Sequence, residues 1–153
     1  VRQAAASNAP LRGGKGELWE GGIRVPFIVS WKGRVGARTV AQPVMSMDAT
    51  VTALDFAGAK TGAGLDGVTL RPLLTTDSNQ PPHDAMFWRV GKKNAVRAGG
   101  WKIIRDGAAW QLYDLDHDSG ETTDVAAREP DRVRAMNAMW DRWNAEQREP
   151  LWK

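Results

Sequence analysis

The residue with the clearest chemical potential in this sequence is Lys15, which stands inside a glycine-rich loop. Gly13 and Gly14 precede it and Gly16 follows it. Glycine lets a backbone approach a ligand closely, and a lysine held in such a loop presents a compact positive charge to an anion. The glycines alone leave two interpretations open, an anion-binding site and a solvated surface lysine.

A longer ordered pattern surrounds this lysine. Residues 8–26 read NAPLRGGKGELWEGGIRVP. This run closely resembles a segment found late in the catalytic domain of type I sulfatases, whose usual form is S-N-x-P-L-R-G-G-K-G, an aromatic residue, and then E-G-G-I-R-V-P. The resemblance implies that Lys15 corresponds to the family's sulfate-binding lysine, which contacts the sulfate group and helps to stabilise charge in the transition state.

Later segments resemble the same family. Residues 66–74 read DGVTLRPLL, where sulfatases have D-G-x-S-L-x-P-L-L. Residues 112–126 read LYDLDHDSGETTDVA, where the family commonly has L-Y-D-L-x-x-D-P-x-E-x-x-N-L-A, so that Ser119 and Asp124 replace a proline and an asparagine. The resemblance matches only the C-terminal part of a sulfatase and covers the blocks 7–31, 46–74 and 84–126.

The resemblance also implies chemistry that this chain lacks. Such enzymes use a formylglycine made from the first residue of a C/S-x-P-x-R motif, and this chain contains neither a cysteine nor that motif. The family's calcium ligands lie mostly in the N-terminal part, and the Asp-Asn pair that usually comes before the segment matching Ser7-Asn8 is missing. We therefore expect calcium and formylglycine in the parent enzyme, no cofactor or metal ligand in this chain, and no activity from the chain alone.

Three functions remain open. The first is the C-terminal part of a sulfatase, in which Lys15 completes an active site for a sulfate ester that a missing N-terminal catalytic part builds. The second is a phospho- or phosphonate hydrolase of the same superfamily, because a lysine in a basic loop would serve phosphate equally well. The third is a non-enzymatic module that binds glycans or nucleic acid through tryptophans. The G-G-K-G segment favours the first, and with it we expect neither nucleic acid nor a membrane as partner.

Composition is typical of a globular protein, with 42% hydrophobic and 25% charged residues in a chain of 153. The formal net charge is +3, and residues 1–40 carry seven basic and two acidic side chains. A basic segment of this kind would attract sulfate esters, phosphates or nucleic acid, or form a solvated face. The eight tryptophans are spread along the chain, and their spacing favours a role in the core over an exposed stacking surface.

The elements that must position Lys15 are predicted from hydrophobic periodicity. The continuous apolar run Val25–Trp31 predicts a strand buried on both faces. Residues 47–57 predict a helix, with Ser46 as its N-terminal cap and Gly58 after its end. Residues 75–83 are polar and proline-rich, which is typical of a linker.

Beyond this linker the hydrophobic period changes to two, which predicts an antiparallel sheet. Asp106-Gly107 indicates a tight hairpin. Residues 130–147 predict an amphipathic helix that packs on the sheet through an apolar stripe. The strands are expected at residues 86–90, 95–97, 101–105 and 110–115, and the stripe consists of Val133, Met136, Trp140 and Trp143.

The predicted fold class is α/β (α+β), the C-terminal portion of an alkaline-phosphatase-like sulfatase fold with a small antiparallel sheet packed against a C-terminal helix. Residues 1–74 would end the catalytic domain with the Lys15 loop, the buried strand and a helix. Residues 75–83 would be a linker, and residues 84–153 a C-terminal subdomain. We expect a strand taken from a larger sheet to promote self-association through exposed core surface. The resemblance favours a periplasmic or secreted location for a bacterial parent.

Two other places were candidates for chemistry. Residues 116–123 are acidic, and Asp-x-Asp spacing suits calcium, but the sixth position lacks the glycine and the twelfth the glutamate of an EF-hand loop. A solvated turn is therefore the preferred interpretation. His83 in the linker and His117 in the acidic turn are expected to be surface residues and not catalytic ones.

Overall fold

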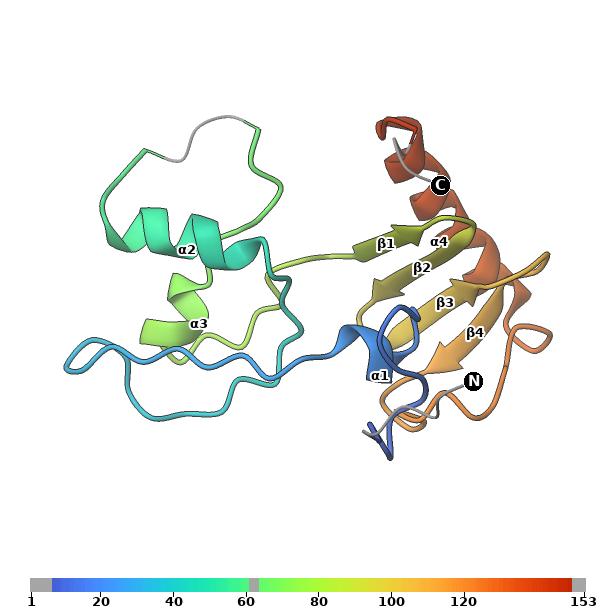
Figure 1. The fold of residues 1–153 in the computed structure, drawn as a ribbon, viewed down its shortest axis with the longest axis horizontal. Helices are drawn as coiled ribbons and strands as arrows, with labels where there is room; N and C mark the ends of the chain where they lie inside the picture. The colour runs from blue at the N-terminus through green and yellow to red at the C-terminus, as the bar shows by residue number, and fades with distance from the viewer. Residues whose placement is uncertain (1–6, 61–63, 150–153) are drawn as a thin grey trace. The chain divides into compact units, whose positions relative to one another are not determined.

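The structure is a computed structural model that describes residues 7–60 and 64–149. Its contacts divide the chain into two compact units (Figure 1), which are described separately. The first unit joins residues 7–25 to residues 85–149, and the second holds the residues between them. The second unit ends at Asp84, directly after the expected linker at residues 75–83. Residues 7–25, which were expected to group with residues 26–74, group with the C-terminal sheet instead.

The first unit is built on a four-stranded antiparallel sheet in the order β1-β2-β3-β4 (Figure 1). The predicted strands are confirmed: β1 is Met86–Val90, β2 Lys93–Ala98, β3 Trp101–Arg105 and β4 Gln111–Asp114. The expected tight turn at Asp106-Gly107 is wrong. Ile104 pairs with Gln111, so the β3–β4 connection is too long to be a two-residue hairpin.

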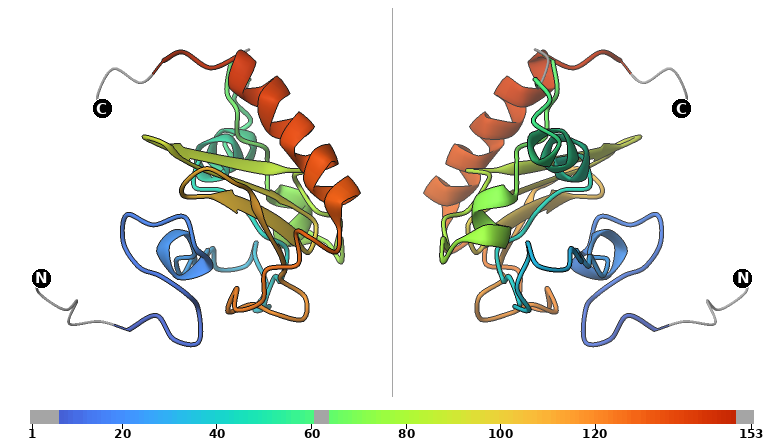
Figure 2. Two further views of the ribbon diagram at one scale, coloured as in Figure 1. Left: turned by 90° about the vertical axis from the view of Figure 1, so that its right-hand side faces the viewer. Right: turned by 90° about the vertical axis from the view of Figure 1, so that its left-hand side faces the viewer.

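Both faces of this sheet are covered, and α4, Pro130–Ala145, lies along one of them (Figure 2). Val96, Ile103 and Leu112 point to this face and form one core cluster with Met136 and Trp140 of α4. The predicted apolar stripe therefore packs on the sheet as expected.

The opposite face carries the segment that contains Lys15. Ala95, Ile104 and Tyr113 form a second cluster there with Leu18 and Trp19. Successive side chains of β3 thus pack alternately into two different cores. This packing explains why residues 7–25 belong to the C-terminal unit.

The tryptophans serve mainly as core residues, as predicted. Trp19 and Trp140 are buried, and four others are half-buried against the two clusters, namely Trp88, Trp101, Trp110 and Trp143. Trp31 is 44% exposed, and Trp152 lies outside the described residues.

The second unit contains α2, Asp48–Phe56, and α3, Arg71–Thr75. The predicted helix is confirmed, but Ser46 does not cap it, because the residue at that place is Met47 and no side chain makes a capping hydrogen bond. The carboxylate of Asp48 instead accepts hydrogen bonds from the backbone N–H groups of Met45 and Val68, at 2.7 and 2.9 Å. None of the helices within the described ranges combines the length and apolar character needed to cross a bilayer.

The apolar run Val25–Trp31 does not form the expected buried strand. It lies outside every helix and strand of the described chain, and the residue Ile28 is 87% exposed. A strand satisfies its backbone groups only by pairing with a neighbour, and the described residues supply none for this run. Phe27 and Trp31 instead line an apolar hollow of about 420 Å³ together with Phe56.

Replacing Trp140 by alanine should strongly destabilise the first unit. Trp140 is 3% exposed, and loss of such a side chain costs about 3–5 kcal/mol of unfolding free energy. Arg142→Ala, at an exposed position of the same helix, should change it by less than about 0.5 kcal/mol. Denaturant titration followed by circular dichroism measures both, and equal effects would contradict the packing described.

Candidate functional site

Lys15 is exposed and lies in a turn that hydrogen bonds between Gly14 and Glu17 close. The backbone N–H of Glu17 donates to the carbonyl of Gly14 at 3.0 Å, and the N–H of Gly14 donates to Oε2 of Glu17 at 2.8 Å. Gly13 and Gly16 have φ values of 77° and 89°, a conformation that favours glycine. The glycines on either side of Lys15 thus shape the turn that presents it.

The flanks of this turn rest on two glycines of α1, Glu20–Ile23. A β-carbon at Gly21 would lie 2.6 Å from the carbonyl oxygen of Arg12, and one at Gly22 would lie 2.2 Å from that of Glu17. No larger residue fits these positions without moving the backbone. The second glycine pair of the sequence is therefore a packing surface for the lysine turn.

Arg12 anchors the N-terminal flank of the turn. Its guanidinium lies 3.6 Å from the centre of the Trp19 ring, and its Nη1 donates to the backbone carbonyl of Glu121 at 2.9 Å and to the hydroxyl of Tyr113 at 3.3 Å. Burial raises the pKa of Tyr113, although the hydrogen bond from Arg12 opposes the rise. Arg12 thus ties the loop to β4 and to the segment that follows it.

A network of four charged side chains, three of them buried, anchors the C-terminal flank. Glu20 is 1% exposed, and Lys102 and Glu121 are fully buried. Lys102 Nζ lies 3.0 Å from Oε1 of Glu20 and 2.8 Å from Oε1 of Glu121; the second contact is an ion pair without hydrogen-bond geometry. Arg97 Nη1 donates to Oε2 of Glu20 at 3.1 Å. The backbone N–H of Glu20 donates to Oε2 of Glu121 at 2.7 Å.

Two carboxylates and two cations balance in this network. Removing one partner of a buried pair leaves an uncompensated charge, which is strongly destabilising. The sequence interpretation missed the network, although β3 carried a signal. Lys102 shares its side of the strand with Ile104, and a lysine among core positions requires a buried partner. The identity of that partner, some 80 residues earlier, has no signature in the local pattern.

A side chain of the acidic turn is hydrogen-bonded to the backbone of the same turn. The carboxylate of Asp118 accepts hydrogen bonds from the N–H groups of Thr122 and Thr123, both at 2.8 Å. His117 is exposed, as expected, and its Nδ1 lies 2.8 Å from a carboxylate oxygen of Asp114. That hydrogen bond raises the pKa of His117 and lowers the pKa of Asp114. Within the described residues, no cluster of three or more His, Asp or Glu side chains suits a metal ion.

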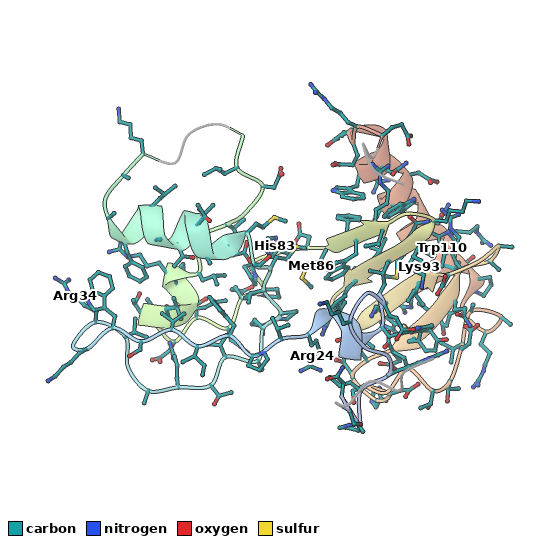
Figure 3. All side chains as sticks on the ribbon, viewed as in Figure 1. Arg24, Arg34, His83, Met86, Lys93 and Trp110 are labelled. Carbon is teal, nitrogen blue, oxygen red and sulfur yellow. The ribbon has the colours of Figure 1, made fainter. Side chains whose placement is uncertain are left out.

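The expectation that His83 is a surface residue is wrong. Its side chain, labelled in Figure 3, is 11% exposed. Its Nε2 lies 2.9 and 3.0 Å from the two carboxylate oxygens of the buried Asp48. The polar composition of residues 75–83 concealed this contact, because nothing in the local sequence shows that the segment returns to the first residue of α2. His83 and Asp48 both belong to the second unit.

Comparison with known proteins identifies the family. Residues 14–149 match the family described as N-sulphoglucosamine sulphohydrolase, C-terminal. The chain belongs to this sulfatase family. Mouse (Mus musculus) steryl-sulfatase is 42% identical over 84 residues, which cover 53% of this chain and 14% of that protein. An uncharacterised sulfatase of Schizosaccharomyces pombe is 30% identical over 95% of this chain and 29% of its own length.

A solved structure agrees with the family assignment and the fold class. The crystal structure of Ps i-CgsB superposes with a TM-score of 0.84 and 29% identity, over 96% of this chain and 34% of that one. The expected sulfatase fold, with an antiparallel sheet and a C-terminal helix, is thereby confirmed. This sulfatase C-terminal chain spans between about one seventh and one third of the length of these relatives.

Replacing Lys102 by methionine should unfold the first unit far more easily. The change leaves two buried carboxylates with the half-buried Arg97 as the partner of Glu20, and breaking such a buried pair costs about 3–5 kcal/mol of unfolding free energy. Lys93→Met is the matched control, because Lys93 pairs with Asp106 on the surface, where a pair contributes less than about 1 kcal/mol. Denaturant titration of both variants tests this difference, and comparable losses would refute the role of burial.

Proposed function

We propose that the parent of this chain hydrolyses sulfate esters and that Lys15 binds the sulfate group of the substrate. The observation that supports this proposal is the turn itself. In a chain of a sulfatase family, an exposed lysine lies in a glycine turn whose flanks pack closely against Gly21 and Gly22. A compact ammonium group suits one oxygen of a tetrahedral anion.

A fixed position is what makes such a charge useful in catalysis. Preorganised charges stabilise a transition state without the cost of reorganising at the moment of reaction. In this proposal, the Lys15 ammonium group contacts an oxygen of the sulfate and offsets negative charge as the ester bond breaks. The anchors at Arg12 and Glu20 would hold the turn in place during that step.

The remaining chemistry is proposed to come from elsewhere in the longer protein. This chain has no cysteine and no C/S-x-P-x-R motif from which a formylglycine could form. The carboxylate of Asp118 accepts hydrogen bonds from the backbone of the acidic turn, and no three His, Asp or Glu side chains of the described residues are grouped to hold a metal ion. The described residues therefore do not fit calcium. We propose that the nucleophile and a calcium site belong to an N-terminal catalytic part, and that this chain alone is inactive.

A phosphate or phosphonate ester hydrolase is the second candidate, because a lysine serves either tetrahedral anion. The names of the relatives favour sulfate. A non-enzymatic stacking module receives less support, since six of the seven described tryptophans pack into the two cores.

Lys15→Ala in the complete enzyme should lower kcat/KM for an aryl sulfate by about 10²–10³-fold, the usual loss for one charge-stabilising group. Lys92→Ala is the matched control, because Lys92 is also an exposed lysine in a turn of the first unit and should keep activity. The assay uses p-nitrophenyl sulfate and p-nitrophenyl phosphate side by side. Preference for phosphate would support the second candidate, and full activity of Lys15→Ala would refute the role of the lysine.

We also propose that the isolated chain self-associates through the apolar run of the second unit. Ile28 and Phe27 are 87% and 52% exposed, and apolar surface in water favours association. Sedimentation velocity should therefore reveal species larger than a monomer. Ile28→Ser should shift the distribution toward monomer, whereas Val90→Ser, at an exposed position of β1, should not. A clean monomer at high concentration would contradict the proposal.

A further inference from the structure

One residue of the acidic turn binds both flanks of the Lys15 loop. The backbone carbonyl of Glu121 accepts a hydrogen bond from Arg12 at 2.9 Å. The carboxylate of the same residue accepts one from the backbone N–H of Glu20 at 2.7 Å. Arg12 and Glu20 lie three residues before and five residues after Lys15. Glu121 therefore closes the base of the loop from more than 100 residues away in the chain.

A continuous series of contacts connects Glu121 to the turn that contains Lys15. Gly21 follows Glu20 directly, and its N–H donates to the carbonyl of Arg12 at 2.8 Å. The next residue, Gly22, packs against the carbonyl groups of Gly14 and Glu17, which close the turn. A displacement of Glu20 would therefore move the backbone on both sides of Lys15.

The conformation of Glu121 fits a role that depends on its side chain. Its φ is 54°, the only positive value among the described non-glycine residues, and a residue with a β-carbon adopts this conformation at a cost. Glycine would adopt it freely, but glycine has no carboxylate. Lys102 lies 2.8 Å from that carboxylate and offsets its buried charge.

We propose that Glu121 is a positioning residue for the Lys15 loop, with Lys102 as the cation that keeps its carboxylate in place. The inference rests on the proposed function of Lys15 as the sulfate-binding group and extends it to a residue of the acidic turn. Glu121 acts through Arg12 and Glu20 and does not touch the substrate. Its contribution to turnover depends on the presence of Lys15.

A double-mutant cycle in the complete enzyme tests this dependence. Glu121→Ala keeps the backbone carbonyl and removes the carboxylate. With Lys15 present, it should lower kcat/KM by about 10- to 100-fold, the loss expected when a reacting group is misplaced by about 1 Å. In the Lys15→Ala background, it should lower kcat/KM by less than about twofold, because the group that it positions is already gone. Equal losses in both backgrounds would overturn the inference.

Amide hydrogen exchange on this chain separates positioning from general loss of stability. Glu121→Ala should accelerate exchange about tenfold or more at Glu17 and Gly21, while Val96 and Ile103 in the sheet change less. Trp140→Ala is the control, because it removes core contacts on the opposite face of the sheet and should accelerate exchange in the sheet as much as in the loop. The same pattern in both variants would overturn the inference.

The two tests also distinguish this inference from the function on which it rests. Full activity of Lys15→Ala would refute the proposed function, and selective exchange at Glu17 and Gly21 would then still support Glu121 as the residue that holds the loop. Loss of activity in Lys15→Ala together with full activity in Glu121→Ala would retain the function and overturn the positioning role.

Discussion

The buried contact between Glu20 and Lys102 is the constraint on which the first unit depends. Lys102 is fully buried on β3, and its ammonium group needs carboxylates within reach. Only a segment that returns to this face of the sheet can bring Glu20 there. The glycine-rich loop is thereby bound to the C-terminal sheet although about 80 residues separate them in sequence. Leu18 and Trp19 add apolar contacts, which are less directional than the ion pairs.

The features with a local periodic signature could be predicted from the sequence. The alternation of apolar and polar side chains predicts the strands of the sheet. The apolar stripe that includes Met136 and Trp140 predicts both α4 and the face of it that is buried. The turn around Lys15 could also be predicted, because glycines mark positions of special backbone geometry. In each of these cases the residues that decide the structure lie within a few positions of one another.

The features that could not be predicted depend on contacts with residues that are remote in sequence. The run Val25–Trp31 has the composition of a buried strand, but composition carries no information about which strand would pair with it. The polar neighbours of His83 predict a surface position, whereas its partner Asp48 is 35 residues away. Glu121 was one acidic residue in an acidic turn. Its buried position follows from Lys102 and from the loop, and neither is nearby in the chain.

An ionic anchor suits this loop better than an apolar one would. Apolar contacts tolerate sliding, because their energy depends on buried area and little on direction. Hydrogen bonds and ion pairs between particular atoms do not tolerate it, so the contacts of Glu20 with Lys102 and Arg97 fix the register of α1 on the sheet. A buried network of this kind contributes little net stability compared with well-packed hydrocarbon. What it provides is a single position for the backbone beside Lys15, and a charge that acts on a transition state requires such a position.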